Sequence, residues 1–199
     1  MRGNYENVRF LAGFITALVI AAVLGFGAVE TGAIPANADR GPLPMERWAA
    51  QTSLHATLRR EAPKDAPFTA TPADLESGAR LYVQNCSVCH GTGESTPDAI
   101  ARGFYIHAPQ FQKDDVTDDP VGVTYWKIDH GIAWTAMPSF HATLGDRDEW
   151  QIAWFLKNQN ALPAAAKNLW DHPNLVAPPT PMPPLPETKS NGLAKPAVK

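Results

Sequence analysis

The sequence predicts an all-α fold, in which one small helical domain follows an apolar helix and precedes a Pro-rich tail. Helix-start patterns at Thr71 and Asp146 bracket the domain, and no alternation of polar and apolar residues between them indicates a β-strand. A chain of 199 residues has room for one domain or at most two. Its nineteen prolines are unevenly placed, so part of the chain lies outside a compact domain.

The composition excludes several classes of function. A formal net charge of -3 lacks the basic excess that is typical of nucleic-acid-binding proteins, so we expect no nucleic acid partner. Two cysteines are too few for a disulfide scaffold with several bridges, and they cannot alone supply the four ligands of a structural zinc site.

Residues 10–29 contain no charged side chain and match the length that crosses a bilayer. Arg2 and Arg9 precede this run, which predicts a transmembrane anchor with residues 1–9 in the cytoplasm and the rest of the chain exported. A cleaved signal peptide is the alternative, because Ala36-Asn37-Ala38 has the small-x-small form of a cleavage site near Ala38. Either interpretation places the domain outside the cytoplasm.

Residues 30–70 are expected to form a stalk. A short amphipathic helix is predicted within it, and linker composition from Ala62 to Pro67 ends that helix. The apolar face of the helix recurs at steps of three and four residues, at Met45, Trp48, Thr52, His55 and Leu58.

Residues 71–170 are expected to form the domain, with helices over 71–85, 124–130 and 146–158. Thr71 is predicted as the N-cap of the first helix, with Pro72 at its first position. The last helix is predicted to open at Asp146 with Glu149 in a variant of the capping box. Residues 171–199 form the Pro-rich tail, which is too polar and proline-rich to bury a core and is expected to be extended or disordered.

Cys86-Ser87-Val88-Cys89-His90 has the C-x-x-C-H spacing that attaches c-type haem. Two thiols at this spacing reach the two vinyl groups of one haem, and the adjacent imidazole then ligates the iron from below. A thioredoxin-like redox pair would need a βαβ context, which the sequence lacks. The pattern therefore predicts one covalently bound haem c, with His90 as an axial ligand.

The sixth iron ligand is expected to come from a methionine or a second histidine. Met137 is the only methionine inside the predicted domain, and Pro138 after it stiffens the loop. Bis-histidine ligation through His130 or His141 is the main alternative to Met137. An open sixth position would instead indicate a haem-based sensor or peroxidase.

Three segments together resemble a class I cytochrome c, in particular the membrane-anchored monohaem bacterial type with a periplasmic domain. They are Cys86 to Gly91, Gly131 to Phe140, and the acidic helix that carries Trp150. The resemblance covers about residues 71–162. It implies a small helical fold around the haem and Met137 as the second axial ligand. It also implies crossing terminal helices, with Gly78 and Tyr82 meeting Trp150 and Trp154 or Phe155.

Two further positions carry over from the resemblance. Pro109 would accept a hydrogen bond from the proximal histidine through its carbonyl, which orients the imidazole. Trp126 would face a haem propionate or belong to the core.

The resemblance implies one-electron transfer between a respiratory or dehydrogenase donor and an acceptor, with no enzymatic reaction of its own. The chain would lie in the bacterial inner membrane with its haem domain in the periplasm, or be soluble in the periplasm after cleavage. A haem c subunit of a larger membrane oxidoreductase is the alternative. The predicted domain has a net charge of -5, which favours redox partners with a basic docking face.

Overall fold

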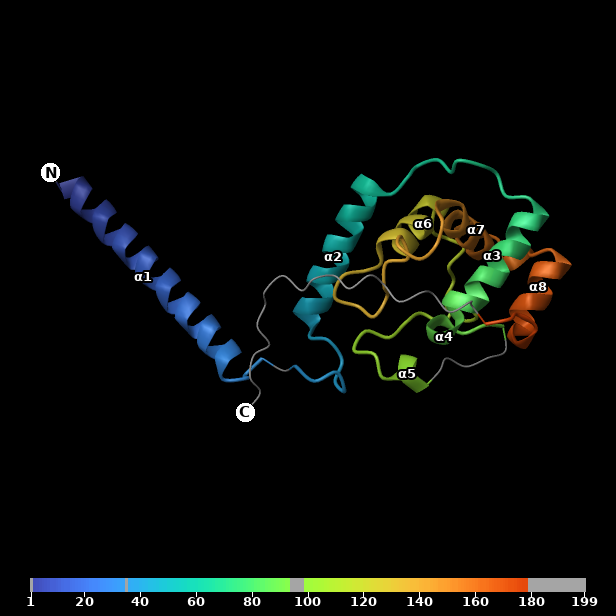
Figure 1. Cartoon of the computed structure of the whole chain (residues 1–199). Helices are drawn as coiled ribbons and strands as arrows, with labels where there is room; N and C mark the ends of the chain where they lie inside the picture. The colour runs from blue at the N-terminus through green and yellow to red at the C-terminus, as the bar shows by residue number, and fades with distance from the viewer. Residues whose placement is uncertain (1, 35, 94–98, 179–199) are drawn as a thin grey trace. The chain divides into compact units, whose positions relative to one another are not determined.

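The structure is a computed structural model that describes residues 2–34, 36–93 and 99–178. All the regular elements in these ranges are helical, as the sequence predicts (Figure 1). The chain divides into two units, Met1–Gly41 and Pro42–Lys199. The first unit contains α1 (Arg2–Glu30), and the second contains the rest of the helices.

Helix α1 includes an apolar segment, Asn7–Glu30, that is long and apolar enough to cross a membrane. Its side chains are exposed rather than packed into a core. A signal sequence near the N-terminus can meet the same criteria of length and composition, so α1 is compatible with both interpretations of the sequence.

Helix α2 (Pro44–Glu61) begins where Glu46 accepts a hydrogen bond from the Leu43 N–H at 3.0 Å. The expected apolar face is not buried, because Met45 is 70% and Trp48 is 61% exposed, and Leu58 is the buried residue of this helix. Helix α2 contacts α6, and Tyr105 donates a hydrogen bond to Glu46. This helix therefore packs against the domain through few side chains.

Helix α3 (Pro72–Asn85) begins as its sequence predicts. The Asp74 N–H donates to the Thr71 hydroxyl at 3.2 Å, and the Thr71 N–H donates to the Asp74 carboxylate at 3.0 Å. This reciprocal pair satisfies two of the backbone donors that a helix start leaves open. The capping interaction fixes the start of the helix that leads into Cys86.

The other helices of the second unit are short. They are α4 (Ser87–His90), α5 (Ala99–Arg102), α6 (Val121–His130), α7 (Asp146–Lys157) and α8 (Ala164–Asp171), with 3-10 turns η1 (Gln159–Ala161) and η2 (Pro173–Leu175). Helix α3 packs against both α7 and α8, and α6 packs against α7 (Figure 1). The core lies between these four helices.

Helices α3 and α7 cross at Gly78. A Cβ atom on Gly78 would lie 2.1 Å from the Gln151 carbonyl oxygen, so only glycine allows this approach. Beside the crossing, the ring of Tyr82 packs against Phe155 with a centroid distance of 5.4 Å. Trp150 stacks instead on Tyr125 of α6 at 4.1 Å, so Phe155 is the residue of α7 that makes the aromatic contact with Tyr82.

The packed chain continues past residue 170, where the sequence places the start of the tail. Trp170 packs against Tyr82 at 5.4 Å, and Val176, which follows η2, is buried in the same core. Gln84 also donates a hydrogen bond to the Ala177 carbonyl. Residues 171–178 therefore cover α3, whereas the rest of the expected tail, 179–199, lies outside the described residues.

Candidate cofactor site

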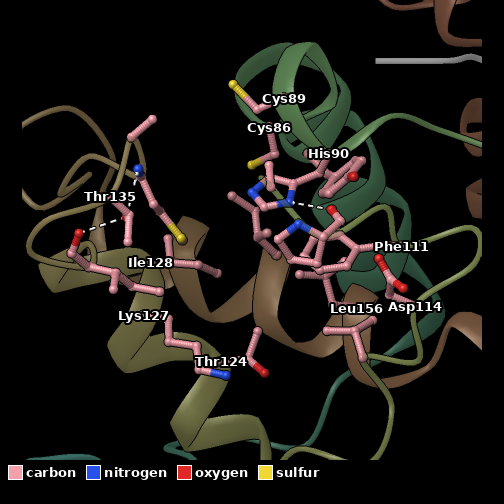
Figure 2. A pocket seen from close by; sticks show the side chains of 18 of the residues that line it. Cys86, Cys89, His90, Phe111, Asp114, Thr124, Lys127, Ile128, Thr135 and Leu156 are labelled. Atoms are coloured by element: carbon pink, nitrogen blue, oxygen red, sulfur yellow. Dashed lines mark hydrogen bonds between the residues drawn. The ribbon is translucent and has the colours of Figure 1, made fainter. Parts of the chain in front are cut away.

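A cavity of about 530 Å³ lies against α4, α6 and α7, within the range of sites that hold a cofactor (Figure 2). Cys86, Cys89, His90, Pro109 and Met137 all line it, so residues far apart in the sequence meet there. Its apolar lining includes Tyr82, Phe104, Phe111, Ile128, Ile152 and Leu156. Volume and lining fit a large planar apolar group with an iron at its centre.

Cys86 lies where α3 ends and α4 begins, and the single turn of α4 carries Cys89 and His90. This turn forms because the N–H groups of Cys89 and His90 both donate to the Cys86 carbonyl at 3.0 Å. Burial, followed by the neighbouring Cys89, raises the pKa of the Cys86 thiol to about 12. Cys86 is therefore a neutral thiol at physiological pH, unlike the thiolate of a redox-active cysteine.

His90 is oriented by Pro109, as the resemblance implies. The Nδ1 atom of His90 lies 2.8 Å from the Pro109 carbonyl oxygen, and a dashed line marks this bond in Figure 2. Because a carbonyl only accepts hydrogen bonds, Nδ1 carries the proton and the lone pair remains on Nε2. Burial lowers the pKa of His90, and the bond to Pro109 opposes that shift. The imidazole is thus neutral and suited to ligate a metal through Nε2.

The loop that carries Met137 is held by its own hydrogen bonds. The Ile132 N–H donates to the Met137 carbonyl at 3.2 Å, and the Met137 N–H donates to the Thr135 hydroxyl at 3.1 Å. Gly131 begins the loop with φ of +68°, and a Cβ there would lie 2.6 Å from the Pro138 carbonyl carbon. Glycine is therefore required for the tight return that brings Met137 to the cavity.

His130 and His141 are not among the residues that line the cavity. Each directs Nδ1 to Asp129 instead, His130 at 2.9 Å and His141 at 2.7 Å. This arrangement supports Met137 over either histidine as the second axial ligand.

Trp126 also lies outside the set of cavity-lining residues, although α6 contributes Thr124, Lys127 and Ile128 to it. Its ring stacks on His130 at 4.6 Å, and its buried Nε1 has no hydrogen-bond partner. Gly122 lies one turn before Trp126 on the same face of α6. A Cβ atom on Gly122 would lie 1.9 Å from the Pro63 carbonyl oxygen, so this face of α6 packs closely against Pro63. Trp126 is thus buried beside His130 and does not contribute to the cavity lining.

The aspartates between residues 114 and 119 mainly organise the loop before α6. Asp114 accepts from the Gln110 N–H at 2.7 Å, and Asp115 accepts from the Thr117 N–H at 2.8 Å. Asp119 forms an ion pair with Lys127 at 2.5 Å. Asp114, Asp115 and Asp119 line the cavity together with Lys127, so the cavity has charged groups at its edge.

Sequence reasoning missed the side chains that shape the cavity around His90. Phe111 stacks on the imidazole with a centroid distance of 4.5 Å and an interplanar angle of 4°. The hydroxyl of Tyr82 donates to the Gly91 carbonyl at 2.7 Å, which fixes the end of α4. Phe111 lies two residues after Pro109, and that proximity was the available signal.

A family model described as cytochrome C oxidase, cbb3-type, subunit III matches residues 73–156. The matched segment begins in α3, includes Cys86, Cys89, His90, Pro109 and Met137, and ends in α7. A search of curated protein sequences gave no match to this chain.

Proposed function

Residues 73–156 belong to the c-type cytochromes and form a class I-like monohaem domain, and we propose that this domain transfers single electrons through a haem held by Cys86, Cys89, His90 and Met137. The family implies haem c and haem-based electron transfer. The observation that carries the residue assignment is that one cavity is lined by both thiols, by an imidazole with a free Nε2 and by a thioether.

The two cysteines would attach the haem covalently. Cys86 and Cys89 would each add an S–H across one vinyl group of the haem, which would form a carbon–sulfur bond and pass the thiol hydrogen to the other vinyl carbon, with no oxidant required. The single turn of α4 supports this role because it carries Cys89 and His90 directly after Cys86.

His90 and Met137 would be the axial ligands. His/Met ligation raises the potential of a haem relative to many other ligand sets, which suits a carrier that delivers electrons to an oxidising acceptor. The hydrogen bond to Pro109 keeps the His90 ring in one orientation and increases its basicity. The protein thus contributes position, burial and electrostatics, and the haem supplies the redox chemistry.

Helix α1 supports a location at a membrane. We propose a single-pass anchor in the bacterial inner membrane with the haem domain in the periplasm, because Arg2 and Arg9 lie before the uncharged run of residues 10–29. The cleaved alternative leaves a soluble periplasmic protein. The mass of the N-terminal peptide of the mature protein distinguishes the two.

A redox partner would dock beside the Met137 loop. Trp134 in this loop is 92% exposed and has φ of +65°, a backbone conformation that tryptophan rarely adopts. The loop lines the cavity at Ile132, Thr135 and Ala136, so a partner in contact with Trp134 lies close to the cofactor. The acidic character of the domain favours a basic face on that partner.

Replacing the cysteines tests the attachment. In the wild type we expect the intact mass to equal the polypeptide plus one haem after denaturation in acid, because the thioethers survive unfolding. Cys86→Ala and Cys89→Ala should each retain at most one thioether, and the double variant should release its haem. A wild-type mass equal to the polypeptide alone would contradict the assignment.

A role as the haem c subunit of a larger membrane oxidoreductase is the second candidate. The description of the matching family, which names a subunit of a cytochrome oxidase, favours it. Purification from native membranes under mild detergent separates the two. A subunit copurifies with fixed partners at constant stoichiometry, whereas a free carrier elutes alone.

A further inference from the structure

Helix α2 contacts the domain along one side only. Glu46 in its first turn accepts a hydrogen bond from the Tyr105 hydroxyl, and Leu58 in its last turn is buried. Leu54, one turn before Leu58, is partly buried. Glu46, Leu54 and Leu58 are separated by multiples of four residues, so they lie on the same side of the helix.

The opposite side of α2 is exposed to solvent. Its residues recur at alternating steps of three and four, which places them in one line along the helix. This line, called the outer stripe below, consists of Met45, Trp48, Thr52, His55 and Arg59, and all five residues are exposed. The contacts on the side of Glu46 and Leu58 therefore determine which residues of α2 face away from the domain.

Large apolar side chains gather at the first turn of α2. Leu43 directly before the helix is 50% exposed, and Met45 and Trp48 are more exposed still. Single exposed apolar residues are ordinary on a soluble protein, but three of them within one turn indicate a contact surface. This end of α2 is also the end that lies nearer in the sequence to the apolar segment of α1.

The charge of this region is opposite to that of the domain. Residues 31–60 contain four arginines and two acidic residues, whereas the predicted domain has a net charge of -5. The outer stripe has no acidic residue and ends in Arg59. The acid of the first turn, Glu46, lies on the opposite side and accepts hydrogen bonds from Tyr105 and from the Leu43 N–H. Anionic lipid headgroups attract arginine, so the stripe is complementary to an anionic bilayer surface.

The length of the connecting chain keeps α2 close to the end of α1. Helix α1 ends at Glu30 and α2 begins at Pro44, so residues 31–43 join them. A chain of this length spans at most about 45 Å even when fully extended. Anchoring of α1 in a bilayer would thus hold α2 at a high effective concentration near the lipid surface, where a weak contact is sufficient.

We propose that the outer stripe of α2 lies in the headgroup region of the anionic bilayer that holds α1. This inference rests on the proposed role of α1 as a membrane anchor. Trp48 and Met45 insert between the lipids, because an indole ring is stable at the boundary between water and hydrocarbon and a thioether chain adapts to its surroundings. Arg59 binds lipid phosphate groups at the other end of the stripe.

This contact would orient the cavity relative to the membrane. The domain-facing side of α2 binds Tyr105 and contacts α6. The neighbours of Tyr105, Phe104 and Ile106, line the cavity, as do three residues of α6. A lipid surface that holds α2 therefore holds the two chain segments beside the cofactor, which presents the cavity in one orientation to redox partners in the same membrane.

The accessibility of a nitroxide label on α2 tests the inference. The full-length, haem-containing protein is reconstituted into vesicles of phosphatidylethanolamine and phosphatidylglycerol. Because Cys86 and Cys89 would be bonded to the haem, an introduced cysteine is the thiol that takes the label. Thr52→Cys places the label in the outer stripe. Ser53→Cys is the matched control, because Ser53 is also exposed but is rotated by about 100° around the helix.

Oxygen concentrates in lipid and a nickel chelate stays in water, so the ratio of their collision rates with the label reports its depth. We expect this ratio to be several-fold higher at position 52 than at position 53. Addition of Trp48→Ser should lower the ratio at position 52 to that at position 53. Replacing phosphatidylglycerol with phosphatidylcholine should reduce the difference between the two positions, because it removes the anionic headgroups.

Equal ratios at positions 52 and 53 in a chain that floats with the vesicles would overturn the inference and leave the anchor intact. Protection of position 52 from both reagents would also overturn it, since a second copy of the chain or another protein would then cover the stripe. A chain that does not float with the vesicles would refute the membrane anchor itself, and the inference with it.

Discussion

Gly78→Ala is expected to destabilise the domain by about 3 kcal/mol or more. Helix propensity alone predicts the opposite sign, since alanine is favoured over glycine by about 1 kcal/mol inside a helix. The Cβ would lie 2.1 Å from the Gln151 carbonyl oxygen and 2.9 Å from Cβ of Phe155, and neither backbone can move without opening the α3–α7 crossing. The steric term is therefore expected to outweigh the propensity term.

Denaturant unfolding of the haem-containing protein measures this effect. Gly103→Ala is the matched control, because a Cβ on Gly103 would meet its nearest neighbour, the Ile100 carbonyl oxygen, at an ordinary 3.5 Å. We expect a lower midpoint for Gly78→Ala and little change for Gly103→Ala. A midpoint for Gly78→Ala equal to or above that of the wild type would show that the helices do not cross at Gly78.

Asp74→Ala is expected to cost about 2–3 kcal/mol at neutral pH. The Asp74 carboxylate accepts hydrogen bonds from Thr71, from Arg147 at 2.7 Å and from Gln151 at 2.9 Å. Its loss removes the cap of α3 and leaves the amide of Gln151 without this buried partner. Thermal unfolding measures the cost, and Glu76→Ala on the same helix is the control, because its ion pair with Arg80 is exposed.

The contribution of Asp74 should also depend on pH. Hydrogen bonds from Gln151 and then Thr71 hold the pKa of Asp74 well below its ordinary value, so the folded state favours the carboxylate. The stabilisation is therefore present above the pKa of an unfolded aspartate, about 3.9, and is lost as the pH falls toward the lower pKa of the folded state. The difference in stability between wild type and Asp74→Ala should shrink below about pH 4. A difference that stays constant to lower pH would contradict this account.

Local sequence signals explain why some helices were predictable and others were not. Thr71, Pro72 and Asp74 specify the start of α3 within a few residues, and the structure has the helix there. Helix α8 was not predicted, although Ala164 to Lys167 are good helix formers. Residues 164–170 lie inside the predicted domain but carry no start signal for a helix, and the contact that stabilises α8 comes from α3, which is remote in the sequence.

The residues of the site also fall into two groups, those that a local sequence motif predicts and those that only the packed structure places. Cys86, Cys89 and His90 lie within five consecutive residues, so the sequence alone indicates the chemistry of this motif. The sequence predicts Glu149 as part of a helix cap because it follows Asp146 by three residues, but the N-cap is Gly145 and the Glu149 side chain is buried. Trp126 likewise lies on a face of α6 that only the packed structure defines. Burial between distant segments leaves no local pattern in the sequence.

Binding of carbon monoxide to the reduced protein tests the central claim most directly, namely that His90 and Met137 both ligate a haem iron that transfers electrons. In the wild type the iron has no open position, so the optical spectrum should stay unchanged when carbon monoxide is added. Met137→Ala opens that position and should bind carbon monoxide at once. A wild type that binds carbon monoxide as readily as Met137→Ala would contradict the assignment and indicate a ligand-binding haem protein.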